Sequence, residues 1–232
     1  ISIDLNNIGD ITQLNINGII NYEFIQLALG ENWANKTKGE ALWSGEIKIK
    51  DKATDISIQT NLKGIEIDFP PPFTKKEDDL TTLSITKNSI DADEELIKIQ
   101  IGVYATANLK RQKNSEGRMK ISSGLISINS KQDKMPEEGI LLSADLSKVS
   151  LEAIDLLFTD LNTEPFITDA DINIKELDVY GYLIEDSNIK YRPVEKNTSI
   201  QILSKDVSGN ILWDKKENIL KAGFEKLHLR KN

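Results

Sequence analysis

Apolar and polar residues alternate with a period of two along much of this chain, which predicts β-strands with one apolar side. The clearest stretch is 41–76, where a polar turn at 51–55 separates two predicted strands. The apolar residues with a common parity are Trp43, Ile47 and Ile49 in the first strand and Ile56, Ile58 and Leu62 in the second. Related patterns predict strands at 1–18, 80–85, 97–103, 119–128, 139–146 and from 171 onward.

The parity of the apolar positions changes at Gly64, after which Ile65, Ile67 and Phe69 carry the apolar side. We predict a β-bulge at 63–64 that bends the sheet, because one extra residue in a strand produces such a change of side. The residues that follow, 70–72, are all proline and cannot donate ladder hydrogen bonds. The strand is therefore expected to end before them, with this loop at an edge of the sheet's opening.

Two short helices are expected among the strands. The first spans 21–29, where Asn21 can cap the free N–H groups and Gly30 ends the helix. The second lies near 150–158, with Ser150 as its cap and Glu152 in its first turn. Because a loop and strands follow each helix, we divide the chain into two loosely repeated units, 1–146 and 147–232. We expect them to form one continuous structure cut from a longer protein.

These patterns predict a mainly β fold with two short α-helices and about 13 strands in a long, twisted, mostly antiparallel sheet. Two helices of this length cover the apolar side of only about two or three strands. The remaining apolar side must be buried against another sheet, closed into a barrel or left open as an apolar groove. The pattern alone leaves these three alternatives open.

Charge and composition exclude several classes of partner. The 232 residues carry a formal net charge of −8, which argues against nucleic acid and against docking on an anionic membrane through a basic patch. The chain has no cysteine, so neither disulfides nor cysteine-based zinc sites are possible. It also has no apolar run near the roughly 18 residues of a membrane span.

No motif in the sequence indicates catalysis or a metal. His228 is the single histidine, and it lies between two leucines at the end of a predicted strand, where an outward orientation is expected. The acidic stretch 91–95 lacks the glycine and distal glutamate of an EF-hand and is interpreted as a solvated turn. Gly-rich phosphate loops and G-x-S-x-G elbows are absent. We expect no enzyme activity, no cofactor and no metal.

The order of several short motifs resembles the YhdP branch of the AsmA-like proteins of Gram-negative bacteria. In 41–76 the resemblance lies in the W-x-G strand that begins at Trp43 and in LKGIEIDFPPPFTK at 62–75. In the second half it lies in LSADLSKVSLEAID at 142–155, LDVYGY at 177–182, SGNILW at 208–213 and FEKLHL at 224–229. This chain departs from the family pattern at two positions. Ser150 replaces an Asp-type cap, and Ile154 stands where tryptophan is usual.

The resemblance implies a segment of a long periplasmic protein that is anchored in the inner membrane. Its sheet would curl into an open apolar groove that carries phospholipid to the outer membrane and supports the barrier there. The implied partners are phospholipid acyl chains, the remaining segments of the same full-length chain, and envelope proteins at either membrane. The alternative is a closed β structural or protein-docking module of the cell envelope that binds no lipid.

Under the first interpretation, the residues expected to line the groove are the strand isoleucines and their apolar neighbours. These candidates are Ile47, Ile49, Ile56, Ile58, Leu62, Ile65, Ile67, Ile97, Ile99, Ile101 and Val103. A third possibility, a carbohydrate-active β domain, is disfavoured because aromatic residues make up only 6% of the chain and offer few surfaces for sugar stacking.

Overall fold

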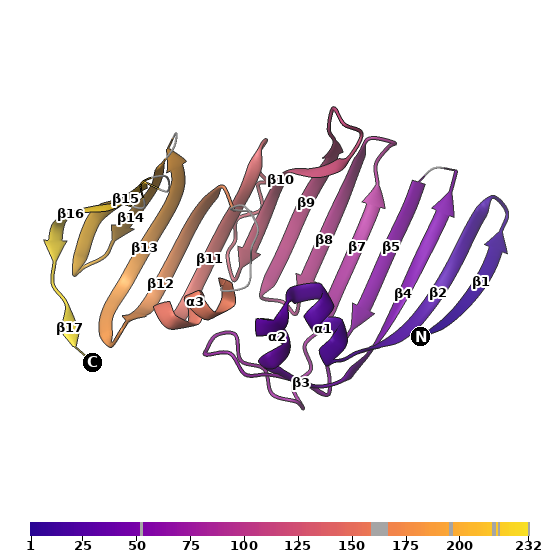
Figure 1. The fold of residues 1–232 in the computed structure, drawn as a ribbon, viewed down its shortest axis with the longest axis horizontal. Coiled ribbons are helices and arrows are strands. Elements are labelled where there is room, and N and C mark those ends of the chain that lie inside the picture. The colour runs from indigo at the N-terminus through magenta and orange to yellow at the C-terminus, as the bar shows by residue number, and fades with distance from the viewer. Residues whose placement is uncertain (52, 159–166, 195–196, 215–216, 218, 232) are drawn as a thin grey trace.

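In a computed structural model, the chain forms one long, open sheet with helices at its lower edge (Figure 1). The structure describes residues 1–51, 53–158, 167–194, 197–214, 217 and 219–231. Within them, 15 strands belong to the main sheet, and all but the last follow one another in space in chain order. The sheet does not close into a barrel, because β1 and β16 stand at opposite ends of the strand order.

The three longest strands of the main sheet lie in the second half of the chain. The main sheet contains β1 (Ser2–Ile8), β2 (Ile11–Ile20), β4 (Ala41–Lys50), β5 (Ala53–Thr60), β7 (Leu83–Ser89), β8 (Glu94–Ile101), β9 (Ala105–Lys113), β10 (Met119–Ile128), β11 (Gly139–Ser150), β12 (Asp169–Val179), β13 (Tyr182–Val194), β14 (Asn197–Leu203), β15 (Val207–Asp214), β16 (Ile219–Leu227) and β17 (Arg230–Lys231). The last of these pairs with β13 rather than with β16. A separate pair is formed by β3 (Thr37–Gly39) and β6 (Ile65–Ile67).

The sheet is mostly antiparallel, as expected, with parallel pairs at β10–β11 and β11–β12. Parallel neighbours need a crossover connection. The first crossover, 129–138, is held to the sheet by the Ser127 hydroxyl, which donates to the Gln132 carbonyl, and by a 2.7 Å contact between Ser130 and Ser143. The boundary between the two sequence units, 146/147, lies inside β11, which pairs with β12 on both sides of it.

The described residues contain three helices, one more than expected: α1 (Tyr22–Leu29), α2 (Glu31–Asn35) and α3 (Leu151–Phe158). The Asn21 side chain accepts a 3.1 Å hydrogen bond from the Phe24 N–H, which confirms the predicted cap. Ser150 accepts a 3.1 Å bond from Ala153 N–H in the same way. The helix α2 was missed because five residues are too few for an apolar periodicity to be visible.

Two apolar cores lie beneath these helices. The first joins α1 and α2 to the lower ends of β2 and β4 and to β6 through Ile20, Ile25, Ala34, Ala41 and Ile65. The second joins α3 to β11, β12, β13 and β15 through Val149, Ala153, Ile174, Leu177, Ile184 and Val207. Both cores therefore pin helices over the same lower end of the sheet (Figure 1).

The predicted bulge at 63–64 is wrong. The chain leaves the main sheet after Thr60, and β6 pairs with β3 in a different sheet. Leu62 has φ 50° and Gly64 φ 93°, a left-handed backbone that ends the strand instead of bulging it. A Cβ on Gly64 would lie 2.3 Å from the Glu40 carbonyl oxygen, so the close approach of these two segments requires glycine.

A change of side does occur, but elsewhere. In β12 both Ile174 and Leu177 are buried in the second core, although their numbers differ in parity. The pairing with β13 passes from Ile174–Ser187 to Glu176–Glu185, and Asp186 between them has φ 47°. This irregularity between β12 and β13 therefore lets an even-numbered and an odd-numbered residue of β12 enter the same core.

Candidate functional site

We call the face of the main sheet that the helices cover at its lower end the inner face. Residues that are paired across neighbouring strands point to the same face, so the register places residues on it in rows that cross the strands. Three successive rows are mostly apolar and extend over most of the sheet. They lie above the helices, at the level of Trp43, Gly45 and Ile47 in β4.

Isoleucine dominates these rows. The lowest, row 1, contains Gly18, Trp43, Thr60, Leu83, Ile101, Ala105, Ile128, Ala144, Ile172, Ile189, Ile202 and Gly209. Row 2 contains Ile3, Ile16, Gly45, Ile58, Ile85, Ile99, Ala107, Ile126, Leu142, Ala170, Tyr191, Ile200 and Ile211. Row 3 contains Leu5, Leu14, Ile47, Ile56, Lys87, Ile97, Leu109, Gly124 and Ile140.

The row above these, row 4, changes character and marks the upper limit of the apolar surface. It begins with Asn7, Thr12 and Ile49 and continues through Thr54 to Ser89, Glu95 and Arg111. The Thr54 N–H donates to the Ser89 hydroxyl at 3.2 Å, which links β5 to β7 at this level. The inner face is therefore bounded by helices below and by polar side chains above.

The opposite, outer face is mostly polar, although Leu125 and Leu141 also lie on it. In the middle of the sheet it presents Ser57, Thr86, Lys98 and Asn108 on four adjacent strands. Farther along, Asn173 donates to Asp145 at 2.8 Å, and Asn188 donates to Asp171 at 2.7 Å. These hydrogen bonds join β11, β12 and β13 across their solvent side.

Seven predicted groove residues lie together on the inner face. They are Ile47, Ile49, Ile56, Ile58, Ile97, Ile99 and Ile101. Most of them are half-buried, although no described strand packs over them as a second sheet. The two-residue alternation found them because it determines which residues share a face.

The other four predicted residues lie elsewhere. Ile65 is buried in the first core, and Leu62 and Ile67 pack against it. Val103 lies in the turn between β8 and β9 and is fully exposed. The alternation did not indicate inner-face residues such as Ile85, Leu109 and Ile126, because their strands interleave apolar residues with small or polar ones.

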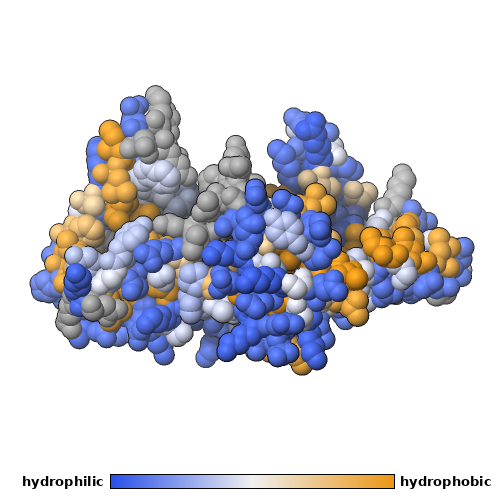
Figure 2. Space-filling view, turned by 60° about the horizontal axis from the view of Figure 1, so that its bottom comes forward, coloured by the Kyte–Doolittle hydropathy of each residue, from blue (hydrophilic) through white to orange (hydrophobic). Residues whose placement is uncertain are grey.

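Apolar surface is open at both ends of the sheet, and Figure 2 shows orange patches over β1 and β2 and over β14–β16. At the first end, Ile3 and Leu5 are each 60% exposed. At the other end, Leu220 and Phe224 of β16 are exposed on the inner face. The inner face thus presents large apolar side chains to solvent along a surface far longer than a single residue cluster.

The resolved pKa shifts belong to groups outside the apolar rows. Burial lowers the pKa of Lys75, whose ammonium donates to the Ile65 carbonyl at 2.7 Å beneath the first core. Hydrogen bonds from Lys110 and then Gln112 lower the pKa of Glu94 on the outer face. Burial raises the pKa of Tyr104. None of these groups forms a catalytic pair with another of the three.

Within the residues that the structure describes, His, Asp and Glu side chains form no group of three that could hold a metal ion. No helix there has the length and apolar character needed to cross a membrane.

A comparison with protein families identifies a relationship over the complete chain. A family model described as "YhdP protein" matches residues 1–232. No curated protein and no solved structure matches the chain. The matched range includes the three apolar rows, the helices and both cores.

Proposed function

Because the chain belongs to the YhdP protein family, we propose that its inner face binds the acyl chains of phospholipids in transit between the inner and outer membranes. The chain would be a periplasmic segment of an AsmA-like envelope protein that is anchored in the inner membrane and supports the outer-membrane barrier. The observation that carries this proposal is the set of three apolar rows that run in register across the strands.

The rows suit acyl chains for a physical reason. Acyl chains need apolar contact and no directional partner, and each buried CH₂ group contributes about 0.8 kcal/mol. Rows 1 and 2 cross 12 and 13 strands spaced about 4.8 Å apart and are about 55 Å long, and row 3 crosses nine strands and is about 40 Å long, so a bound lipid has equivalent positions along them. Movement between such positions requires no catalytic residue, so we propose a carrier and not an enzyme.

The alternative is a protein-docking module of the cell envelope that binds no lipid. The sheet is open at β1 and β16, so the closed form of that alternative does not fit the described strands. An open apolar face is still compatible with a protein partner, because exposed apolar surfaces mark either kind of site. The identity of the captured molecule therefore decides between these functions.

A photoreactive amino acid placed on either face tests the proposal. Substitution of Ile58 and Ile99 places it in row 2, and substitution of Ser57 and Lys98 places it on the outer face of the same strands. After illumination with vesicles of phosphatidylethanolamine and phosphatidylglycerol, mass spectrometry should detect lipid adducts at the row 2 positions only. Equal capture on both faces, or capture on neither, would contradict the proposal.

A further inference from the structure

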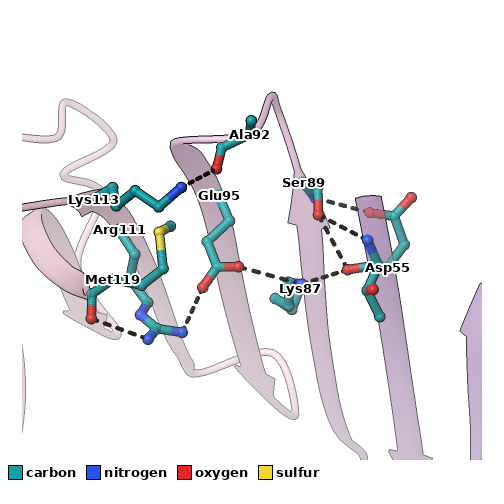
Figure 3. A network of polar contacts seen from close by, with 9 residues as sticks. Asp55, Lys87, Ser89, Ala92, Glu95, Arg111, Lys113 and Met119 are labelled. Carbon is teal, nitrogen blue, oxygen red and sulfur yellow. Dashed lines mark hydrogen bonds and ion pairs between the residues drawn. The ribbon is translucent and has the colours of Figure 1, made fainter. Parts of the chain in front are cut away.

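Three charged side chains lie at the upper limit of the apolar rows, on strands β7, β8 and β9 (Figure 3). Glu95 and Arg111 are paired neighbours in row 4, and Lys87 belongs to row 3 directly below. The Glu95 carboxylate lies 3.2 Å from the Lys87 ammonium and 2.5 Å from an Arg111 guanidinium nitrogen. We call these three residues the rim triad.

The rim triad is a fixed structure. The Glu95 side chain is only 11% exposed, and each of its oxygens faces one of the two cations. The Lys87 ammonium also donates to the Thr54 carbonyl, and Arg111 donates to the Met119 carbonyl at 3.3 Å. The triad therefore ties together β5, β7, β8, β9 and β10, and the two cations have little freedom to move.

The rim triad has a net charge of +1, because two cations share a single carboxylate. This local excess contrasts with the net charge of −8 on the whole chain. A lysine has three N–H donors and an arginine five, more than the partners named above use. The Lys87 side chain is 20% exposed and that of Arg111 32% exposed, so the remaining donors can be reached by a ligand.

The distance of the rim triad from the lowest apolar row is close to the distance between the acyl-chain ends and the phosphate of a phospholipid. Rows are two residues apart along a strand, or about 6.8 Å, so row 4 lies about 20 Å from row 1. The acyl chains of one leaflet occupy about 15 Å, half of a hydrocarbon core about 30 Å thick. A lipid with its acyl chains on rows 1–3 would therefore place its phosphate near row 4.

We infer that Lys87 and Arg111 bind the phosphate of a phospholipid whose acyl chains lie on the three apolar rows, and that Glu95 holds the two cations in position. The inference rests on the proposed function and adds to it a defined site for the head group. Arginine and lysine are the usual partners of phosphate, and partial burial strengthens such charge-assisted hydrogen bonds. The neighbouring apolar rows make a phospholipid, and not a free anion, the expected ligand.

Two probes separate this inference from the proposed function. One is short-chain phosphatidylglycerol, and the other is the diacylglycerol with the same acyl chains, which lacks the phosphate. The unchanged chain should bind both, with phosphatidylglycerol bound more tightly. Failure to bind either probe would contradict the proposed function itself, whereas equal affinity for both would contradict only the head-group site.

The decisive variant is the neutral triple change K87Q/E95Q/R111Q, which removes the net charge without leaving Glu95 buried and unpaired. It should weaken phosphatidylglycerol binding about tenfold or more, because hydrogen bonds to charged groups are lost, and leave diacylglycerol binding unchanged. The matched control E94Q/K98Q/K110Q removes two cations and one carboxylate from the outer face of β8 and β9, so that net charge changes equally, and it should alter neither affinity. Unchanged phosphatidylglycerol binding in the triple variant would overturn the inference, as would an equal loss for both probes.

A single change at Glu95 tests its positioning role. E95Q removes the carboxylate that holds Lys87 and Arg111 in position, so phosphatidylglycerol should bind more weakly than to the unchanged chain, whereas diacylglycerol binding should not change. Equal or tighter phosphatidylglycerol binding would contradict the positioning role of Glu95. Inorganic phosphate alone should bind at least about tenfold more weakly than phosphatidylglycerol, because it makes no contact with the apolar rows. Equal affinity would indicate a site for free anions and overturn the assignment to a lipid.

Discussion

At the scale of single residues, the position of the Trp43 ring explains why glycine stands at Gly18 and at Gly45 of the W-x-G stretch. The indole ring lies over Gly18, the residue paired with Trp43 in β2, and over Gly45, two positions along in β4. A Cβ on Gly18 would lie 2.5 Å from the indole nitrogen, and one on Gly45 would lie 2.9 Å from the ring. The two glycines therefore let a large ring lie flat at the junction of row 1 and the first core.

Gly18→Ala should therefore destabilise the chain, because the added methyl group displaces the Trp43 ring. We expect a loss of about 1–3 kcal/mol in the free energy of unfolding, measured by urea denaturation. The control is Gly223→Ala in β16, where the new Cβ would meet no atom within 4 Å and where the effect should stay within about 0.5 kcal/mol. Similar losses for both variants would exclude ring displacement as the cause.

At the scale of elements, the helices depend on the residues just before them. Asn21 directly follows β2, and Ser150 is the last residue of β11. The side-chain oxygen of each accepts a hydrogen bond from a free N–H group in the first turn of the helix that follows. Both helices then turn over the inner face at its lower end, where Ile25 and Ala153 enter the two cores. The two caps thus determine where helices begin to cover the inner face of the sheet.

Asn21→Ala should cost about 1 kcal/mol of stability, because the Phe24 N–H loses its acceptor at the start of α1. Asn21→Ser keeps an acceptor at this position and should retain most of the stability. The midpoints of urea unfolding, followed by circular dichroism, measure both variants. An equal loss in the two would mean that the hydrogen bond is not what stabilises the helix.

At the scale of the whole molecule, the sheet formed by the described residues combines one apolar face with β1 and β16 as its edge strands. Open edge strands carry unpaired N–H and C=O groups and are prone to association. At the β1 end, the exposed Ile3 and Leu5 add apolar contact to that tendency. The open edge and its exposed apolar side chains therefore make the chain prone to pair with copies of itself.

Replacing Ile3 and Leu5 together by lysine should reduce self-association at high protein concentration, as measured by light scattering. The added charge both removes apolar contact and repels a second copy at the edge. The control places lysine at Ser2 and Asn6, which point to the outer face of the same strand, so that net charge changes equally. If the control reduces association to the same extent, charge alone is responsible and the apolar face has no part in it.

Local alternation and short motifs predicted most of the strands, the residues that share a face, and the family. Seven inner-face isoleucines follow directly from the two-residue alternation, because successive side chains in a strand point to opposite faces. The two capped helices also follow from local chemistry, since a cap acts on the backbone within three residues. The resemblance drawn from the order of short motifs is confirmed by the family match over residues 1–232.

The three-dimensional fold was needed to distinguish an open sheet from a closed one, because local alternation carries no information about strand order or about the pairing of distant residues. It also moved Leu62, Ile65 and Ile67 from the expected groove into the first core, since positive φ angles at Leu62 and Gly64 turn the chain out of the sheet. The stretch 41–76 therefore contributes the strands β4 and β5 to the open sheet, and its later residues pack in the first core. Likewise, the rim triad depends on register, which brings Lys87, Glu95 and Arg111 together from three strands.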